Sequence, residues 1–316
     1  MSQPLSVLVL AGGISHERDI SLRSGRLVAD GLQAHGLSVE LADPDANLLS
    51  RMSDNAPDVV WPVLHGASGE DGTLRSLLQM MNLPYVGSTA EATRLAWDKP
   101  SAKTLVERAG VKTPESIGLS RDAFRELGAE SVLDLVADTI GFPLVTKPAR
   151  GGSAQGVSWV SEKEELRRAM VHAFTYSDDV LVERQVIGTE ICVGIIDTGD
   201  GPQTLPAVEI EPKGGHYTFE ARYTAGETRF YSPPRRDEAA LAHAATQALL
   251  AHDTIGLRDL SRIDFIVDDE GECWFLEASV MPGLTETSTV ALALDQAGYE
   301  VTDIYRALAT HAAARS

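Results

Sequence analysis

Two apolar segments near the start of the chain each lead into a glycine-rich loop and then into a stretch with helical spacing. Residues 6–11 have the composition of a buried strand and end at a Gly-Gly pair, and residues 21–32 repeat apolar side chains at helical intervals. The same order recurs where residues 58–64 precede a second glycine-rich loop and a helical stretch at 73–81. This alternation predicts a parallel sheet, whose ligands should bind at the carboxyl ends of the strands, beside both loops.

Length and composition limit the class of protein. The chain has 316 residues, of which 43% are hydrophobic and 23% charged. This length exceeds what one hydrophobic core usually organises, so we expect two or three lobes. The composition is typical of globular proteins and argues against collagen, coiled-coil and disordered chains. The formal net charge of -19 repels a phosphate backbone over most of the surface. We therefore expect small-molecule substrates and no nucleic-acid partner.

Cysteine usage favours a reducing compartment, and the hydropathy near the start of the chain argues against a secretory or membrane-spanning segment. Cys192 and Cys273 lie far apart and form no C-x-x-C pattern, so we interpret both as small core residues. The apolar stretch at residues 5–11 is too short to span a membrane and lacks the basic flank of a secretory signal. We expect a cytoplasmic protein without a membrane partner.

The rest of the chain mixes helical and strand patterns, with a lobe boundary predicted near Trp97. The further predicted elements are helices at 99–109, 132–140 and 238–252, a strand at 142–147 and several strands within 190–212. No internal repeat or low-complexity tract is recognisable.

The most informative segment, residues 262–279, predicts a β-hairpin with two acidic residues facing each other. If its Glu-Gly dipeptide forms a two-residue loop, Asp264 lies directly opposite Glu277, whereas a three-residue loop would break this register. Arg262 then pairs with Ser279 on the same face. Opposed carboxylates about 4.5 to 5.5 Å apart at Cβ are destabilising unless they are neutralised. Magnesium, held by these oxygens and by a nucleotide, is the expected cation; a solvated acidic face is the alternative.

A second candidate site combines a lysine with a glycine-rich loop. Residues 142–148 predict a buried strand that delivers Lys147, and the loop follows at 151–156. Glycines allow backbone amides to approach phosphate closely. The loop is neither a Walker loop nor a G-x-G-x-x-G motif. On its own it could equally be a flexible hairpin with a surface lysine, and the acidic pair is what favours phosphate binding.

An ordered series of short motifs runs along nearly the whole chain. The motifs lie at 12–22, 65–72, 84–88, 98–99, 147–148, 152–153, 183–190, 220–223, 262–264 and 282–288. In this order and spacing they resemble the D-alanine:D-alanine ligase family of the ATP-grasp superfamily. The resemblance implies a fold that is α/β and α+β, with three lobes. These are an N-terminal parallel-sheet (Rossmann-like) lobe at 1–98 and two lobes at 99–188 and 189–316 that clamp ATP.

The resemblance also implies which residues bind ATP and metal. Lys99 and Lys147 would hold the ATP phosphates, and Arg222 would reach phosphate as well. Adenine and ribose would lie against Glu183, Arg184, Val186 and Glu190. The metal ligands would be Asp264, Glu277 and Ser279, which would bind one or two Mg²⁺ ions.

The amino-acid site is implied in the same way. Glu17 would receive the ammonium group of the first amino acid, and Ser153 and Tyr223 would link the closing loops over it. Arg262 would stabilise the oxyanion of the tetrahedral intermediate, where a fixed guanidinium has most effect. The other substrate residues would be His65 and Glu70 on the first-substrate side, and Gly283 and Ser288 near the second, with Ser288 at its carboxylate.

The implied reaction requires a closed site. A carboxylate is a poor electrophile, so it would first take the γ-phosphate of ATP, and the amine would then displace phosphate from the acyl phosphate. Because water would hydrolyse this intermediate, we expect lids at 151–156 and 214–228. The implied product is D-alanyl-D-alanine for peptidoglycan precursors, made by a cytoplasmic homodimer.

Several positions depart from the family pattern. Ser279 stands where asparagine is usual, so the second magnesium is expected to bind through water or less tightly. Arg222 replaces a lysine, and a guanidinium binds phosphate as a fork instead of a point charge. The other departures are Ala154, Arg75, Ser76, Thr289 and Ala291. They leave open a paralogue that joins a different amine in a biosynthetic pathway and, as a third interpretation, a nucleotide-binding pseudoenzyme.

Overall fold

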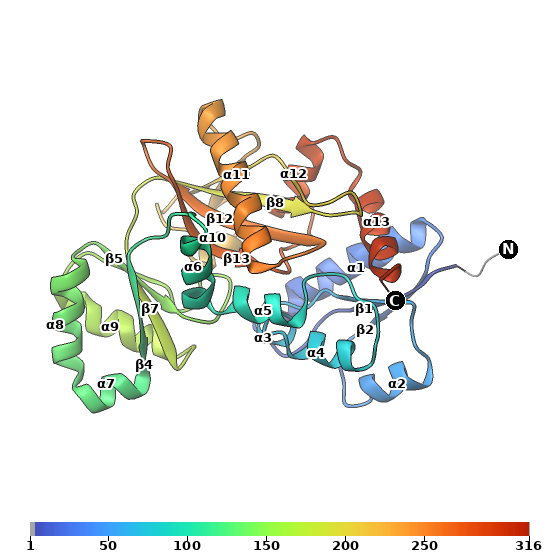
Figure 1. Cartoon of the computed structure of the whole chain (residues 1–316), viewed down its shortest axis with the longest axis horizontal. Coiled ribbons are helices and arrows are strands. Elements are labelled where there is room, and N and C mark those ends of the chain that lie inside the picture. Colours follow the sequence, from blue (N-terminus) through green and yellow to red (C-terminus); the bar gives the residue numbers. More distant parts are fainter. Residues whose placement is uncertain (1–3, 316) are drawn as a thin grey trace.

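Three β-sheets organise the chain, one for each of three groups of elements (Figure 1). The computed structural model describes residues 4–315. Within them lie a three-stranded parallel sheet, a four-stranded antiparallel sheet and a six-stranded antiparallel sheet. The fold class predicted from the sequence, mixed α/β and α+β, is confirmed.

The first sheet has the order β2-β1-β3 and is parallel throughout. Its strands are β1 (Ser6–Leu10), β2 (Ser38–Ala42) and β3 (Val59–Pro62). The helices around it are α1 (Arg18–Ala34), α2 (Leu48–Asp54), α3 (Ala67–Glu70), α4 (Thr73–Met80) and α5 (Ala90–Trp97). The predicted parallel sheet is therefore confirmed, and both glycine loops follow the carboxyl ends of neighbouring strands, β1 and β3.

The second sheet has the order β4-β7-β5-β6. Its strands are β4 (Ser116–Ser120), β5 (Leu144–Pro148), β6 (Ser158–Val160) and β7 (Asp179–Arg184), and its helices are α7 (Arg121–Leu127), α8 (Ala129–Ile140) and α9 (Lys163–Phe174). Strand side chains alternate between the two faces. Leu144, Val160 and Val182 consequently pack with α8 and α9, and the intervening residues face the other way, toward the centre of the molecule.

The third sheet has the order β11-β10-β8-β12-β13, with β9 paired to β8. Its strands are β8 (Thr189–Ile196), β9 (Gln203–Thr204), β10 (Val208–Pro212), β11 (Thr228–Tyr231), β12 (Leu260–Val267) and β13 (Cys273–Ser279). The helices of this part are α10 (Phe219–Tyr223), α11 (Glu238–Ile255), α12 (Thr289–Gln296) and α13 (Val301–Ala313).

Two helices cover one face of this third sheet. A stripe of alanines on α11, including Ala240, Ala244 and Ala248, is buried against the sheet. The helix α6 (Lys99–Arg108) packs beside it, against α11 and β13. The predicted lobe boundary at residue 99 remains a prediction, but the buried apolar side chains of α6, Ala102 and Val106, belong to the core of the six-stranded sheet.

The last helix, α13, returns to the first sheet and packs against α1 and β3 (Figure 1). Trp61 and Tyr305 meet edge to face with ring centroids 5.6 Å apart. Gly31 of α1 permits the approach, because a Cβ there would lie 2.9 Å from Thr302 and 3.2 Å from Tyr305. The first and third parts of the chain therefore share one hydrophobic core.

The hairpin prediction was right about the pairing and wrong about the turn. Asp264 lies opposite Glu277, as predicted. The turn, however, has three residues, because the backbone N–H of Asp268 donates to the carbonyl of Glu272 at 3.1 Å. Phe265 then pairs with Phe275, and one additional residue on β13 forms a bulge before Glu277. The long turn and the bulge shift the register by one residue in opposite directions, so the acidic pair is preserved.

Both cysteines are buried free thiols, which confirms their interpretation as core residues. Burial raises the pKa of each thiol to about 12, so neither is a thiolate at neutral pH. In the part of the chain that the structure describes, no helix is both long enough and apolar enough to cross a membrane.

Candidate active site

Two adjoining cavities lie between the lobes. The first, of about 560 Å³, is enclosed by the second and third sheets, and the second, of about 600 Å³, lies between the glycine loops of the first lobe and the third sheet. Lys99, Gly152, Arg222 and Glu277 line both. Because the two cavities meet at the charged side chains of Lys99, Arg222 and Glu277, a group bound there could pass from a ligand in one cavity to a ligand in the other.

One wall of the first cavity is formed by charged side chains on the inner face of the second sheet. Glu183 lies on β7 opposite Val145, and Lys147 is two residues further along β5, within diagonal reach. The Lys147 Nζ lies 2.5 Å from one carboxylate oxygen of Glu183, and the Lys103 Nζ lies 2.6 Å from the other. Burial alone would raise the pKa of Glu183, but the two ammonium groups lower it below its usual value.

The opposite wall carries the acidic pair of the hairpin. Arg262 donates to both oxygens of Asp264, from Nε and Nη2 at 2.6 Å each. The Lys99 Nζ lies 3.1 Å from a Glu277 oxygen and donates to the Gly151 carbonyl at 2.6 Å. Burial would raise the pKa of Glu277, but Lys99, with weaker help from Arg222, lowers it to about 2. Cationic side chains of the protein thus neutralise both carboxylates.

A third carboxylate, Glu190 on β8, lies near this pair. Burial raises its pKa to about 7, Arg222 opposes the rise, and the charges of Asp264 and Glu277 add to it. Among the described residues no group of three or more carboxylate, His or Cys side chains has metal-binding geometry. Two carboxylates nevertheless fit Mg²⁺, which commonly completes its shell with phosphate oxygens and water. The predicted metal site remains a prediction.

Ser279 pairs with Arg262, as the register predicted. Its side chain lines the second cavity, not the first. It therefore lies on the second-cavity side of the acidic pair, and its metal role remains a prediction.

The remaining nucleotide residues predicted from the sequence also line the first cavity. Arg184 and Val186 lie on its rim, although the Arg184 side chain is 45% exposed and donates to Glu115 at 2.9 Å. The Arg222 guanidinium stacks over the Tyr217 ring at 4.0 Å from the ring centre, and its buried Nε has no partner. Arg222 is thus held beside the junction of the cavities with hydrogen-bonding capacity to spare.

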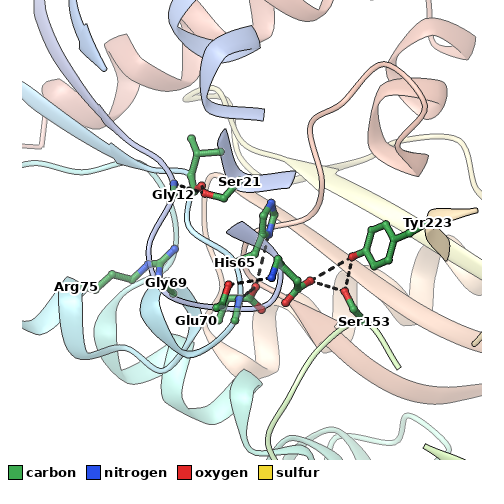
Figure 2. Close-up of polar contacts among 12 residues, drawn as sticks. Gly12, Ser21, His65, Gly69, Glu70, Arg75, Ser153 and Tyr223 are labelled. Carbon is green, nitrogen blue, oxygen red and sulfur yellow. Dashed lines mark hydrogen bonds and ion pairs between the residues drawn. The ribbon is translucent and has the colours of Figure 1, made fainter. Parts of the chain in front are cut away.

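Three separate segments of the chain meet where Ser153 and Tyr223 contact each other (Figure 2) and also contact Glu17. The Ser153 hydroxyl donates to Glu17 and lies 2.6 Å from the Tyr223 hydroxyl, which also donates to Glu17 at 3.3 Å. Ser153 and Ala154 have φ of +54° and +57°, a strained conformation for residues other than glycine. Burial, with the nearby Glu17 charge, raises the pKa of Tyr223 to about 12, so its hydroxyl keeps its proton. The sequence-predicted trio is therefore in contact.

His65 and Glu70, which the sequence predicted on the first-substrate side, line the second cavity (Figure 2). Glu70 accepts a hydrogen bond from the Gly66 N–H at 3.0 Å and lies 3.7 Å from the His65 Nδ1. The His65 Nε2 is buried without a partner. An unpaired ring nitrogen at a cavity wall is available to a polar ligand.

Ser288 and Gly283 also line the second cavity. Ser288 caps α12, and its hydroxyl oxygen accepts from the Ala291 N–H at 3.3 Å. The hydroxyl proton remains free to donate, and the positive end of the helix lies beside it, so the position favours a carboxylate.

Sequence reasoning assigned no role to three buried polar residues near these cavities, although it noted Arg75 as a departure from the family pattern. Ser21 donates to the Val63 carbonyl at 2.5 Å and accepts from Gly12 at 2.8 Å, so it ties the two glycine loops together (Figure 2). Arg75 is 1% exposed and donates to the Gly69 carbonyl, which braces the loop that carries Glu70. The third is Lys103. Its spacing of four residues from Lys99 on a predicted helix was the available signal.

Family models and known proteins resemble the chain over most of its length. A model described as D-ala D-ala ligase C-terminus matches residues 105–310, and one described as D-ala D-ala ligase N-terminus matches residues 40–88. A D-alanine--D-alanine ligase of Bordetella petrii is 34% identical over 97% of this chain and 92% of its own length. One of Geobacter sulfurreducens is 37% identical over 94% of this chain and 90% of its own.

Solved structures share the fold. The VanG D-Ala:D-Ser ligase from Enterococcus faecalis has a TM-score of 0.84 at 25% identity and covers 98% of this chain and 100% of its own. A D-alanine--D-alanine ligase from Bacillus anthracis complexed with ATP has a TM-score of 0.80 at 24% identity, with 98% of this chain and 97% of its own covered. This second likeness concerns the fold alone.

Proposed function

The chain belongs to the D-alanine–D-alanine ligase family, and from this membership we propose that it is an ATP-dependent ligase that joins two D-alanine molecules. The observation that supports this reaction best is the junction of the two cavities at Lys99, Arg222 and Glu277. ATP would occupy the first cavity and the amino acids the second, so the γ-phosphate would lie at the junction.

The first step would transfer the γ-phosphate to the carboxylate of the first D-alanine. Glu17 would hold the ammonium group of this substrate, which directs its carboxylate toward the junction. Lys99, Lys147 and Arg222 would offset the charge of the phosphates during transfer. Asp264 and Glu277 would hold Mg²⁺, whose charge would further neutralise the phosphate oxygens when it is bound.

The second step would be attack of the second amine on the acyl phosphate, with loss of phosphate. Ser288 and the N-terminus of α12 would hold the carboxylate of this substrate. Arg262 uses Nε and Nη2 for Asp264, which leaves Nη1 to stabilise the oxyanion, with the Gly283 backbone beside it. His65 and Glu70 would shape the side of the first substrate.

Two lids would keep water from the acyl phosphate. The contact of Ser153 with Tyr223 joins the lid at 151–156 to the lid at 214–228, and both reach Glu17. These contacts support a closed arrangement in which binding of the first amino acid stabilises lid closure.

The part of the site proposed for the second substrate differs from the family pattern. Thr289 and Ala291 depart from the family pattern near Ser288, and one of the similar structures is a D-Ala:D-Ser ligase. A ligase that accepts another amine is therefore the second candidate. We further propose that the protein is a cytoplasmic homodimer and that its product enters peptidoglycan precursors.

One assay distinguishes these activities. Purified protein is incubated with ATP, Mg²⁺ and single or paired D- and L-amino acids, phosphate release is measured, and products are identified by mass spectrometry. Release and a dipeptide with D-alanine alone support the first candidate. Release that requires another amine supports the second. ATP binding without release in any mixture would contradict both.

A further inference from the structure

Lys103 is a buried lysine that lines neither cavity. It lies one turn after Lys99 on α6, and its side chain is 4% exposed. Its Nζ lies 2.6 Å from Glu183, whose side chain is 3% exposed. Burial lowers the pKa of Lys103 and Glu183 opposes this change, so the close contact with a carboxylate is what makes a buried ammonium tolerable.

The buried cluster contains two cations and one anion. Lys147 occupies one oxygen of Glu183 and Lys103 the other, and of the two lysines it is Lys147 that faces the first cavity. If Lys147 moves toward a phosphate, the Glu183 oxygen that it contacts loses its ion-pair partner. With no second lysine, this movement would leave a buried carboxylate without a counter-ion, which is strongly unfavourable.

We propose that Lys103 is a positioning residue, the permanent counter-ion of Glu183 that allows Lys147 to leave the carboxylate for the phosphates of the nucleotide. This inference rests on the proposed function only in taking ATP as the ligand of the first cavity. Lys103 also keeps Glu183 anionic and fixed in orientation. An anionic carboxylate can only accept hydrogen bonds, so it suits a ligand that presents an amino group.

The test compares Lys103→Met with Lys103→Arg and with Lys163→Met, a matched control. Lys163 pairs with Asp134 at 2.9 Å in the same part of the chain, but its side chain is 52% exposed. ATP binding is measured calorimetrically without amino acids, and steady-state kinetics follow. Lys103→Met should weaken ATP binding and raise the KM for ATP by roughly tenfold or more. The reason is that Glu183, with no other counter-ion, then competes with the phosphates for Lys147. The KM for D-alanine should not change.

Lys103→Arg should restore most of the ATP affinity, and Lys163→Met should behave as the unaltered protein. A Lys103→Met variant that binds ATP normally, or one whose KM values for ATP and D-alanine rise together, would overturn the proposal. Because ATP binding is measured alone, this result is separate from the identity of the amino acids, which the product assay on the unaltered protein decides.

A double variant separates the counter-ion role from a general loss of packing. Glu183→Gln removes the buried charge, so adding Lys103→Met to it should change ATP affinity by less than about twofold. The comparison remains valid if Lys103→Met alone does not fold, because the double variant lacks the unpaired carboxylate. A further tenfold loss in the double variant would mean that Lys103 acts independently of Glu183, contrary to the proposal.

Discussion

At the scale of single residues, the candidate site consists of pairs of opposite charge. In each pair a cationic side chain neutralises a carboxylate. Arg262 neutralises Asp264 through two hydrogen bonds, and Lys99 neutralises Glu277. Asp264 and Glu277 face each other, so their negative charges would repel each other if they were not neutralised. The two cations offset this repulsion. In the proposed reaction the same groups would lie around the place where negative charge develops.

Replacing Arg262 tests the oxyanion role. Arg262→Ala should lower kcat by about 100-fold or more, the effect of losing an oxyanion partner. Arg262→Lys keeps a positive charge beside Asp264 but loses the planar fork of the guanidinium. Its kcat should therefore lie between that of the unaltered protein and that of Arg262→Ala. Pre-steady-state and steady-state phosphate release would measure both variants. An unchanged kcat for Arg262→Ala would refute the role.

Ser279→Asn tests the metal role of this position. Asparagine has a longer side chain than serine, and its amide oxygen is a stronger metal ligand than a hydroxyl. The Mg²⁺ concentration that gives half-maximal turnover should therefore fall if Ser279 is a weak ligand. Ser53→Asn, at an exposed position of α2, is the matched control. If the Mg²⁺ dependence of Ser279→Asn equals that of the control, position 279 does not bind metal.

At the scale of elements, close packing decides where the charged residues lie. Ala240, Ala244 and Ala248 form the small-residue face of α11 against the third sheet, and α6 packs beside this helix. Since α6 carries both Lys99 and Lys103, the spacing between α11, α6 and β13 sets how far these lysines reach into the site. The capping of α6 by Asp98, whose side chain accepts from the Ser101 N–H, fixes where the helix begins.

Enlarging one alanine of this stripe should destabilise the packing of α11 against the third sheet. Ala248→Leu should destabilise the protein by about 1 to 3 kcal/mol, because the added atoms overpack a filled interface. Ala242 is exposed on the same helix, so Ala242→Leu should change stability by less than about 0.5 kcal/mol. Chemical denaturation of both variants measures the difference, and equal stabilities would contradict the packing argument.

At the scale of the whole molecule, the first and third parts of the chain share a core. Tyr305 on α13 packs on Trp61 and donates to the Leu284 carbonyl at 3.2 Å. Leu284 belongs to the segment that precedes Ser288. The C-terminal helix therefore connects the parallel sheet of the first lobe to the loop expected to hold the second substrate.

Tyr305→Phe should weaken this connection without leaving a large cavity. Loss of the hydrogen bond leaves the buried Leu284 carbonyl unpaired, which should lower the free energy of unfolding by about 1 to 3 kcal/mol. The KM of the second amino acid should rise more than that of ATP, because the affected loop lies in the second cavity. Tyr299→Phe, at a side chain that is 43% exposed, is the control. Equal effects in the two variants would argue against the connection.

The sequence by itself determined the features that depend on neighbouring residues. Alternation and glycine spacing predicted the parallel sheet and its loops, and the motif series identified the trio of Glu17, Ser153 and Tyr223 that is in contact in the structure. The facing pair Asp264 and Glu277 was also predicted. The alternation, the glycine spacing and the hairpin are local, since side-chain period and turn chemistry depend on a few neighbouring residues. The trio joins segments far apart in the sequence, and the resemblance of the motif series to a known family is what indicated it.

Only the tertiary structure decided which residues far apart in the sequence form buried ion pairs and packing contacts. The burial of Lys103 against Glu183, the burial of Arg75 under the loop of Glu70 and the return of α13 to the first sheet join segments far apart in the sequence. The bulge in β13 that compensates for the longer turn likewise depends on packing of the whole sheet. No local periodicity encodes such contacts, because they form only when separate elements pack together and exclude water.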